Sequence, residues 1–185
     1  MRGKTTIPSG ANLDGTRSFN RRVVLETIRL NGPLSRADIA RQSTLALQTI
    51  SNIVDELLEA ELVIETQRRP LTRGAPSMDL ALNPEGGFTV GVSLDAERLT
   101  ALLVDLSGKV RAQLHEPTVS ASPDATLSQV EKLVRRLLTQ AKAGRDRAWG
   151  VGLVLPALFE GGSLVSLGSS MPGWPGLQIA DRLSV

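Results

Sequence analysis

The chain has 185 residues, a formal net charge of +2, an apolar fraction of 41% and no cysteine. The absence of cysteine excludes disulfide bonds and thiolate metal sites, and a single histidine, His115, excludes a site built from several histidines of this chain. No stretch approaches the roughly 18 consecutive apolar residues of a membrane helix, and residues 1–16 lack the apolar segment of a signal peptide. We therefore expect a cytoplasmic globular protein with no membrane, metal or cofactor, in which His115 is a strand residue.

Positive charge is concentrated in the first part of the chain. Residues 1–76 hold 11 lysines and arginines against 8 aspartates and glutamates, whereas the remainder holds 10 against 11. This asymmetry favours a nucleic-acid-binding region near the N-terminus.

The first predicted elements are an arm and a helix. Residues 1–16 are polar and contain Gly and Pro, which predicts a flexible arm. Residues 17–31 predict a helix whose apolar side packs on the segment that follows. Gly32 and Pro33 end this helix.

Residues 35–61 predict two short amphipathic helices separated by a tight turn. Ser35, followed by Asp38 three residues on, is close to a capping box at the start of the first helix. The inward-facing residues recur at steps of three and four, as one buried helical face requires; they are Ile39 and Ala40, then Ile50, Ile53, Val54, Leu57 and Leu58. This arrangement is typical of a helix-turn-helix.

The outer face of the second helix predicts contacts with DNA bases. Near the helix start it carries short, mostly polar side chains, which reach base edges in a major groove without desolvating a fixed charge: Leu47, Gln48, Thr49, Ser51 and Asn52. Arg36 and Arg41 on the preceding helix are predicted to hold phosphates.

A basic hairpin follows the helix pair. Residues 62–66 are a short apolar run and residues 78–82 alternate as a strand does, and the loop between them carries Arg68, Arg69 and Arg73. Arginines on such a wing neutralise phosphates or enter the minor groove. Residues 17–83 are therefore predicted to form a winged helix-turn-helix. Two alternatives stay open: a helical bundle used for dimerisation, and a solvated hairpin tip without DNA contacts.

The second half of the chain has a different periodicity. Residues 84–87 are predicted to be a linker. Three antiparallel strands (88–94, 99–106, 109–116), a helix from about 130 to 142 and a buried strand (149–155) follow. This order is most of one lobe of a ribonuclease-H-like, or actin-like ATPase, fold. The predicted fold class is therefore α+β, with a partial α/β lobe at residues 88–185.

Five segments resemble the ROK family, which includes sugar-responsive repressors and sugar kinases. The resemblance covers about residues 17–185 and is carried by SRADIA, TISNIVDELLEAELV, RGAPSMDLALNP, GVSLDAERLTALLVDLSGKV and GVGLVLPALFEGG followed by MPGW. The N-terminal helices point to the repressor branch. The resemblance implies a DNA-binding repressor of carbohydrate-utilisation genes that responds to a sugar inducer. One head contacts only a few base pairs, so we expect a homodimer on a palindromic operator. A protein-interaction or oligomerisation module without specific DNA binding is the alternative.

The chain departs from the family pattern in the turn and the wing. Thr44 stands where the family has a turn glycine, and Ala46 stands where it has a capping serine. Thr44 must therefore enter a conformation that glycine adopts more easily, and loss of the cap costs about 1 kcal/mol. Ala75 replaces the second arginine of the wing motif.

A sugar kinase is the least favoured reading. The kinases hold ATP phosphates with an Asp-x-Gly-Gly-Thr turn, whereas this chain has Ser93, Asp95, Ala96 and Glu97 at the matching positions. Side chains replace the glycines, and two carboxylates oppose the phosphates. We therefore expect no enzyme activity.

The family's sugar-binding residues and zinc motif follow the region that matches residues 177–185. The resemblance therefore implies a chain truncated within the first lobe. Candidates for the border of a sugar cleft are Pro156, Ala157 and Trp174. For Trp174, a position in the core is the favoured hypothesis.

Overall fold

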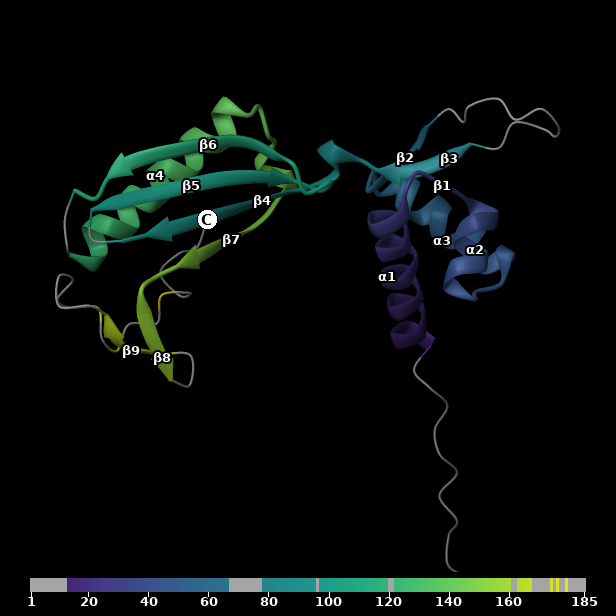
Figure 1. Ribbon diagram of the computed structural model, residues 1–185, viewed down its shortest axis with the longest axis horizontal. Coiled ribbons are helices and arrows are strands. Elements are labelled where there is room, and N and C mark those ends of the chain that lie inside the picture. The colour runs from purple at the N-terminus through teal and green to yellow at the C-terminus, as the bar shows by residue number, and fades with distance from the viewer. Residues whose placement is uncertain are drawn as a thin grey trace, which may run out of the picture. The chain divides into compact units, whose positions relative to one another are not determined.

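The computed structural model describes residues 13–66, 78–95, 97–119, 122–160 and 163–167, with Trp174, Gly176 and Ile179. These residues form two compact units, Met1–Asn83 and Pro84–Val185 (Figure 1). Within the described ranges, no helix has both the length and the apolar character needed to cross a membrane. The same ranges contain no group of three His, Asp or Glu side chains placed to hold a metal ion.

The first unit packs helices against a small antiparallel sheet. Its helices are α1 (Leu13–Asn31), α2 (Arg36–Ser43) and α3 (Leu47–Glu59). Its strands β1 (Leu34–Ser35), β2 (Val63–Thr66) and β3 (Asp79–Leu82) are ordered β1-β3-β2, and both pairings are antiparallel. The helix α1 begins four residues before the predicted start, so the predicted arm is helical from residue 13 onward.

The apolar periodicity of the helix pair accounts for the core of the first unit. Among the residues predicted to face inward, Ile39, Ile50, Ile53, Val54 and Leu57 are buried, and Ala40 and Leu58 pack partly buried against them. Val24 and Ile28 of α1 complete the packing from the other side. Burial of each such aliphatic side chain contributes about 1.5–3 kcal/mol, which is why this face dictates where the helices lie.

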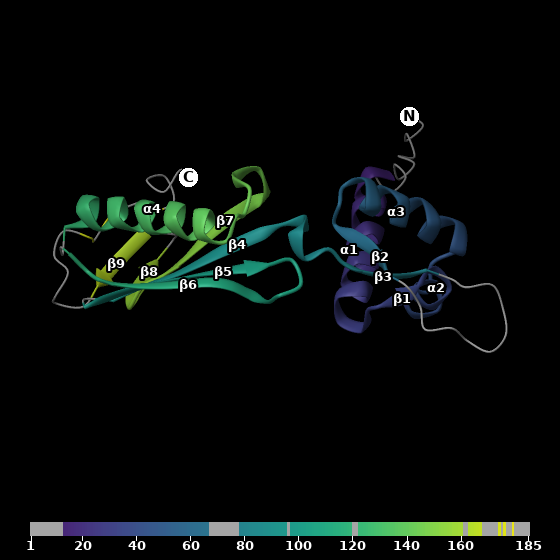
Figure 2. The same ribbon diagram turned by 90° about the horizontal axis from the view of Figure 1, so that it is seen from above.

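The second unit places one helix across a mixed sheet (Figure 2). The strands β4 (Phe88–Leu94), β5 (Arg98–Asp105), β6 (Val110–Pro117) and β7 (Ala148–Val154) are ordered β6-β5-β4-β7. The β4–β7 pairing is parallel and joined through α4 (Pro123–Gln140), and the other two pairings are antiparallel. Short 3-10 turns lie at η1 (Pro84–Gly86) and η2 (Arg145–Arg147), and β8 (Ala157–Glu160) pairs with β9 (Ser163–Leu167). The predicted α+β class and lobe are confirmed.

Alternation along the central strands builds the second core. Every second residue of β4 is buried, as are Leu99, Ala101 and Leu103 of β5. The buried face of α4 lies over them and carries Leu127, Val130, Leu133, Val134, Leu137 and Leu138. His115 lies in β6 with its Nδ1 3.1 Å from Thr100 Oγ1, as expected of a strand residue.

The strand predicted at 149–155 is present as β7, but the prediction that it is buried is wrong. Among the described residues, β7 pairs only with β4, so it lies at an edge of the sheet. Trp149 is 55% exposed and Val154 is 66% exposed. An apolar run has the same appearance in the sequence whether its strand is central or at an edge, so the pattern could not distinguish the two.

The segment predicted as a linker packs on the second unit. Pro84–Gly86 forms η1, and Glu85 is held by Arg111 Nη1 at 2.6 Å through its carboxylate and by Arg147 Nη1 at 3.0 Å through its carbonyl. Gly87 is buried beside the indole of Trp149. On the other side, Asn83 bonds to the first unit.

Candidate nucleic-acid interface

A capping box fixes the start of α2. The Asp38 amide donates to Ser35 Oγ at 3.2 Å, and the Ser35 amide donates to Asp38 Oδ2 at 3.4 Å, as the sequence predicted. The hydrogen bond from the Ser35 hydroxyl outweighs partial burial and, with Arg41 nearby, holds the pKa of the Asp38 carboxyl below its usual value. The carboxylate therefore caps the helix in its charged form, which also suits the positive end of the helix dipole.

The turn between α2 and α3 shows both predicted departures from an ideal motif. Thr44 has φ 59° and ψ 16°, in the left-handed region that favours glycine. Its hydroxyl donates to the carbonyl of Ser43 at 2.7 Å. Ala46 is the N-cap of α3 and makes no side-chain capping bond. The turn is therefore formed without either of the residues that usually stabilise it.

The start of α3 presents the predicted base-reading residues together. Leu47 is 55% exposed, and Gln48 and Asn52 are exposed one turn apart. Gln48 Nε2 donates to Asn52 Oδ1 at 3.0 Å, and Ser51 Oγ donates to the carbonyl of Leu47 at 3.1 Å. Each side-chain amide has a further donor or acceptor that this hydrogen bond does not use. Gln and Asn amides pair with adenine in a major groove through such groups. Thr49 and Ser51 are half-buried.

A surface hollow of about 520 Å³ joins α2 to the start of α3. Its walls combine cationic, hydroxyl and apolar side chains: Ser35, Arg36, Ala37, Asp38, Arg41, Leu47, Ser51 and Met78. The fold thus brings both predicted phosphate-binding arginines beside two of the predicted base-reading residues. This side chain set suits a polyanion that also offers apolar groups, such as DNA with its thymine methyls.

Both arginines of this hollow are already ion-paired. Arg36 Nη2 lies 3.1 Å from Asp55 Oδ1 of α3, and Arg36 Nη1 lies 3.3 Å from Glu65 Oε1 of β2. Arg41 pairs with Asp38. The sequence did not reveal the partners of Arg36, because they lie 19 and 29 residues away. A phosphate at Arg36 has to compete with two carboxylates.

The wing arginines Arg68, Arg69 and Arg73 lie outside the described residues. The strands that flank them are defined. Thr66 Oγ1 donates to the carbonyl of Asp79 at 3.1 Å, which closes the end of the β2–β3 ladder next to this loop.

The turn that matches the kinase phosphate loop is closed by hydrogen bonds between its own residues. Asp95 Oδ1 accepts the amides of Glu97 at 2.8 Å and Arg98 at 2.7 Å. These two bonds, Glu97 first, hold the pKa of Asp95 below its usual value. The carbonyl of Asp95 in turn accepts a bond from Thr118 Oγ1 at 3.0 Å. Backbone amides that a phosphate would need are therefore occupied by a carboxylate.

The candidate residues for a sugar cleft do not share one environment. Pro156 is exposed between β7 and β8, and Ala157 is half-buried at the start of β8. Trp174 is fully buried in the core of the second unit. In this structure Trp174 packs inside the lobe rather than along a cleft.

The winged helix-turn-helix followed by a β6-β5-β4-β7 lobe is similar to the N-terminal part of a ROK transcriptional regulator. A crystal structure of a ROK family transcriptional regulator, described as a homologue of the Escherichia coli MLC protein, matches with a TM-score of 0.63 and 27% identity. The match covers 86% of this chain and 40% of that one.

Curated relatives point to the same family. The xylose repressor of Bacillus spizizenii is 24% identical over 144 residues, which are 78% of this chain and 38% of the repressor. The N-acetylglucosamine repressor of E. coli O6:H1 is 28% identical over 153 residues, which are 80% of this chain and 37% of the repressor. No family model matches the chain. The chain therefore has homologues among ROK regulators and spans about two fifths of their length.

Proposed function

We propose that this chain is a sequence-specific DNA-binding transcriptional regulator, acting in the cytoplasm without enzymatic activity. The observation that carries the proposal is the cluster at the start of α3, exposed Leu47, Gln48 and Asn52 with half-buried Ser51, beside Arg36 and Arg41. Its similarity to ROK regulators, in sequence and in fold, supports the same assignment.

In the proposed mechanism, α3 enters the major groove by its N-terminal end. Gln48 and Asn52 exchange their mutual hydrogen bond for bonds to a base edge, and Leu47 contacts a thymine methyl. Arg36 and Arg41 leave their carboxylates for the backbone phosphates, which positions the helix. Arg68, Arg69 and Arg73 of the wing add further phosphate or minor-groove contacts.

We further propose that the regulator is a repressor of carbohydrate-utilisation genes that acts as a homodimer on a palindromic operator. The names of the xylose and N-acetylglucosamine repressors supply the sugar class. The symmetry follows from size, because a single reading head covers too few base pairs for useful affinity.

The test is to incubate the purified chain with fragmented DNA from its own source at near-physiological salt and to sequence what is retained. We expect enrichment of a two-fold symmetric motif. Gln48→Ala and Asn52→Ala should change the preferred sequence, whereas Lys132→Ala on the exposed side of α4 should not. Retention without an enriched motif would overturn the proposal and favour the interaction module.

The sugar response is tested on the enriched DNA. Xylose and N-acetylglucosamine are titrated separately into the protein–DNA complex. Release by one sugar but not by the other supports a sugar-responsive repressor, and release by neither contradicts a response of this chain to these two sugars.

A further inference from the structure

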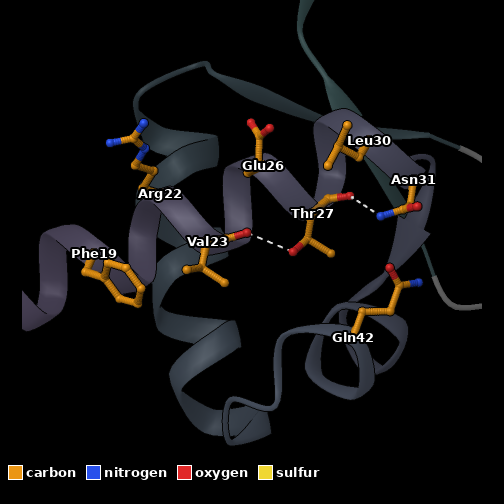
Figure 3. Close-up of a pocket in the computed structure, with 8 residues that line it drawn as sticks. All are labelled: Phe19, Arg22, Val23, Glu26, Thr27, Leu30, Asn31 and Gln42. Atoms are coloured by element: carbon orange, nitrogen blue, oxygen red, sulfur yellow. Dashed lines mark hydrogen bonds between the residues drawn. The ribbon is translucent and has the colours of Figure 1, made fainter.

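The helix α1 has a second apolar face that the proposed DNA contacts do not use. Val24 and Ile28 face the core, whereas Phe19 is 65% exposed and Leu30 is 63% exposed. The exposed face borders a hollow of about 330 Å³ (Figure 3), lined by Phe19, Arg22, Val23, Glu26, Thr27, Leu30, Asn31 and Gln42. A surface helix ordinarily has one apolar stripe, so the second stripe indicates a contact surface.

The residues of this second stripe have the spacing of a helix–helix seam. Phe19, Val23, Glu26 and Leu30 follow one another at steps of four, three and four, which is the a/d pattern of a coiled coil. The spacing of these four residues is the same when it is read from either end of the helix. An identical helix running antiparallel therefore places Phe19 against Leu30 of the second copy, and Val23 against Glu26 of the second copy.

The charged residues of α1 fit this arrangement. Glu26 accepts two hydrogen bonds from Arg29 of its own helix, one from Nε at 2.8 Å and one from Nη2 at 2.6 Å. Arg22 precedes Val23, so the antiparallel arrangement brings Arg22 of one copy beside Glu26 of the other. Each Glu26 is then flanked by an arginine from both copies, so the one carboxylate in the seam has cationic partners on both sides.

Two polar side chains beside the stripe, Thr27 and Asn31, donate hydrogen bonds within α1. Thr27 Oγ1 donates to the carbonyl of Val23 at 2.8 Å, and Asn31 Nδ2 donates to the carbonyl of Thr27 at 3.3 Å (Figure 3). Covering this face therefore leaves neither the hydroxyl nor this amide N–H without a partner, which removes the usual cost of burying polar atoms.

We infer that this α1 face is an interface with a second copy of the chain, formed by antiparallel packing about a two-fold axis between Val24 and Leu25. The inference rests on the homodimer of the proposed function and assigns its contact surface; the contact itself needs no DNA. A seam of three helical turns buries less than the roughly 1,600 Å² of a standard interface, so we expect a weak and reversible contact. It supplies the two-fold symmetry that a palindromic site requires.

Cross-linking tests the register directly, because the chain contains no cysteine of its own. Phe19→Cys and Leu30→Cys are prepared separately in the full chain, with tags of different size, and oxidised alone and mixed, without DNA. The two positions are about 16 Å apart along one helix. We expect the mixture to form disulfide-linked dimers several times more efficiently than either variant alone or a Lys132→Cys control. Equal yields in all samples, or dominant 19–19 links, would overturn the antiparallel interface.

Self-association gives an independent measurement. In sedimentation experiments, Phe19→Glu and Leu30→Glu should each weaken association about tenfold, because each places an unpaired carboxylate against an apolar partner. The matched control is Val119→Glu, which changes an equally exposed apolar residue of the second unit. Unchanged association in both variants would contradict the inference. If the 19–30 link forms only after residues 1–12 are deleted, the chain's own N-terminal segment covers this face of α1 in the full chain, and the inference fails.

These outcomes are distinct from those of the DNA experiment. Loss of sequence-specific binding with an intact 19–30 link would overturn the proposed function alone. A selective DNA motif without the link would overturn the interface alone.

Discussion

Arg36, at the first position of α2, lies 3.1 Å from the carboxylate of Asp55 in the middle of α3. This ion pair connects the two helices of the helix-turn-helix, and Glu65 of β2 binds the same guanidinium from the wing. Arg36 therefore bridges α2, α3 and β2 in the absence of DNA. The same contacts oppose its proposed role as a phosphate ligand.

Asp55→Asn is predicted to strengthen DNA binding severalfold. The change removes a negative charge from the proposed interface and leaves Arg36 more available to a phosphate. The salt dependence of binding should steepen by about one unit of slope. Fluorescence anisotropy with an enriched DNA fragment at several salt concentrations measures both effects. Glu59→Gln, which removes a carboxylate from the last residue of α3, is the control. Weaker or unchanged binding by Asp55→Asn would show that Arg36 does not contact DNA.

Thr44→Gly is predicted to stabilise the first unit by roughly 0.5–1 kcal/mol. Thr44 occupies the left-handed region at φ 59°, where a side chain costs more than the added freedom of glycine in the unfolded chain. Urea unfolding followed by far-UV circular dichroism measures the change. Thr139→Gly is the control, because Thr139 lies exposed in α4, where glycine should cost about 1 kcal/mol. Destabilisation by both substitutions would show that Thr44 is not strained.

The capping box predicts a pH dependence for the first unit. The folded-state pKa of Asp38 lies below its unfolded value near 3.9, so its contribution is present above that value and is lost as the pH falls through the folded pKa. Asp38→Ala should therefore cost about 1 kcal/mol near neutral pH and progressively less below about pH 4.

Circular dichroism reports this effect if the second unit is monitored separately. Both tryptophans, Trp149 and Trp174, belong to the second unit, so their fluorescence transition serves as the internal control. A cost that stays constant with pH would indicate that Asp38 acts through packing rather than through its charge.

Gly87→Ala is predicted to displace the indole of Trp149. A Cβ at position 87 would lie 2.4 Å from Cε2 and Cζ2 of that ring, so the ring must move. We expect an altered Trp149 emission and a loss of about 1 kcal/mol from the second unit. A Trp149→Phe background identifies which tryptophan responds. Gly150→Ala is the control, because nothing lies within 4 Å of its added Cβ. Identical emission from both variants would contradict the close approach.

The sequence patterns predicted those parts of the fold that depend on residues close together in the chain. The spacing from Ile50 to Leu57 fixed the buried face of α3, and Ser35 with Asp38 fixed the start of α2. Apolar runs predicted β4 and β5, and alternate residues of both strands are buried because α4 covers one face of each. At the candidate interface, the same helical periodicity indicated which residues of α3 face outward.

Features set by pairing between distant segments were missed. The strand β1 has two residues, which is too short to show a period, and it exists because Leu34 pairs with Leu80. The hairpin of β8 and β9 was not predicted either, although its two strands are neighbours in the sequence. The ion pairs of Arg36 depend on how α2, α3 and β2 are brought together, which no local pattern encodes.

The anchoring on both sides of Pro84 has a mechanical meaning. Asn83 is fastened to the first unit by its amide at 3.0 Å from the Leu62 carbonyl and by its side chain at 2.7 Å from the Glu61 carbonyl. Glu85 is fastened to the second unit by Arg111 and Arg147. The chain is thus held by hydrogen bonds within each unit on either side of Pro84, so a local movement of either unit carries its own end of the junction with it.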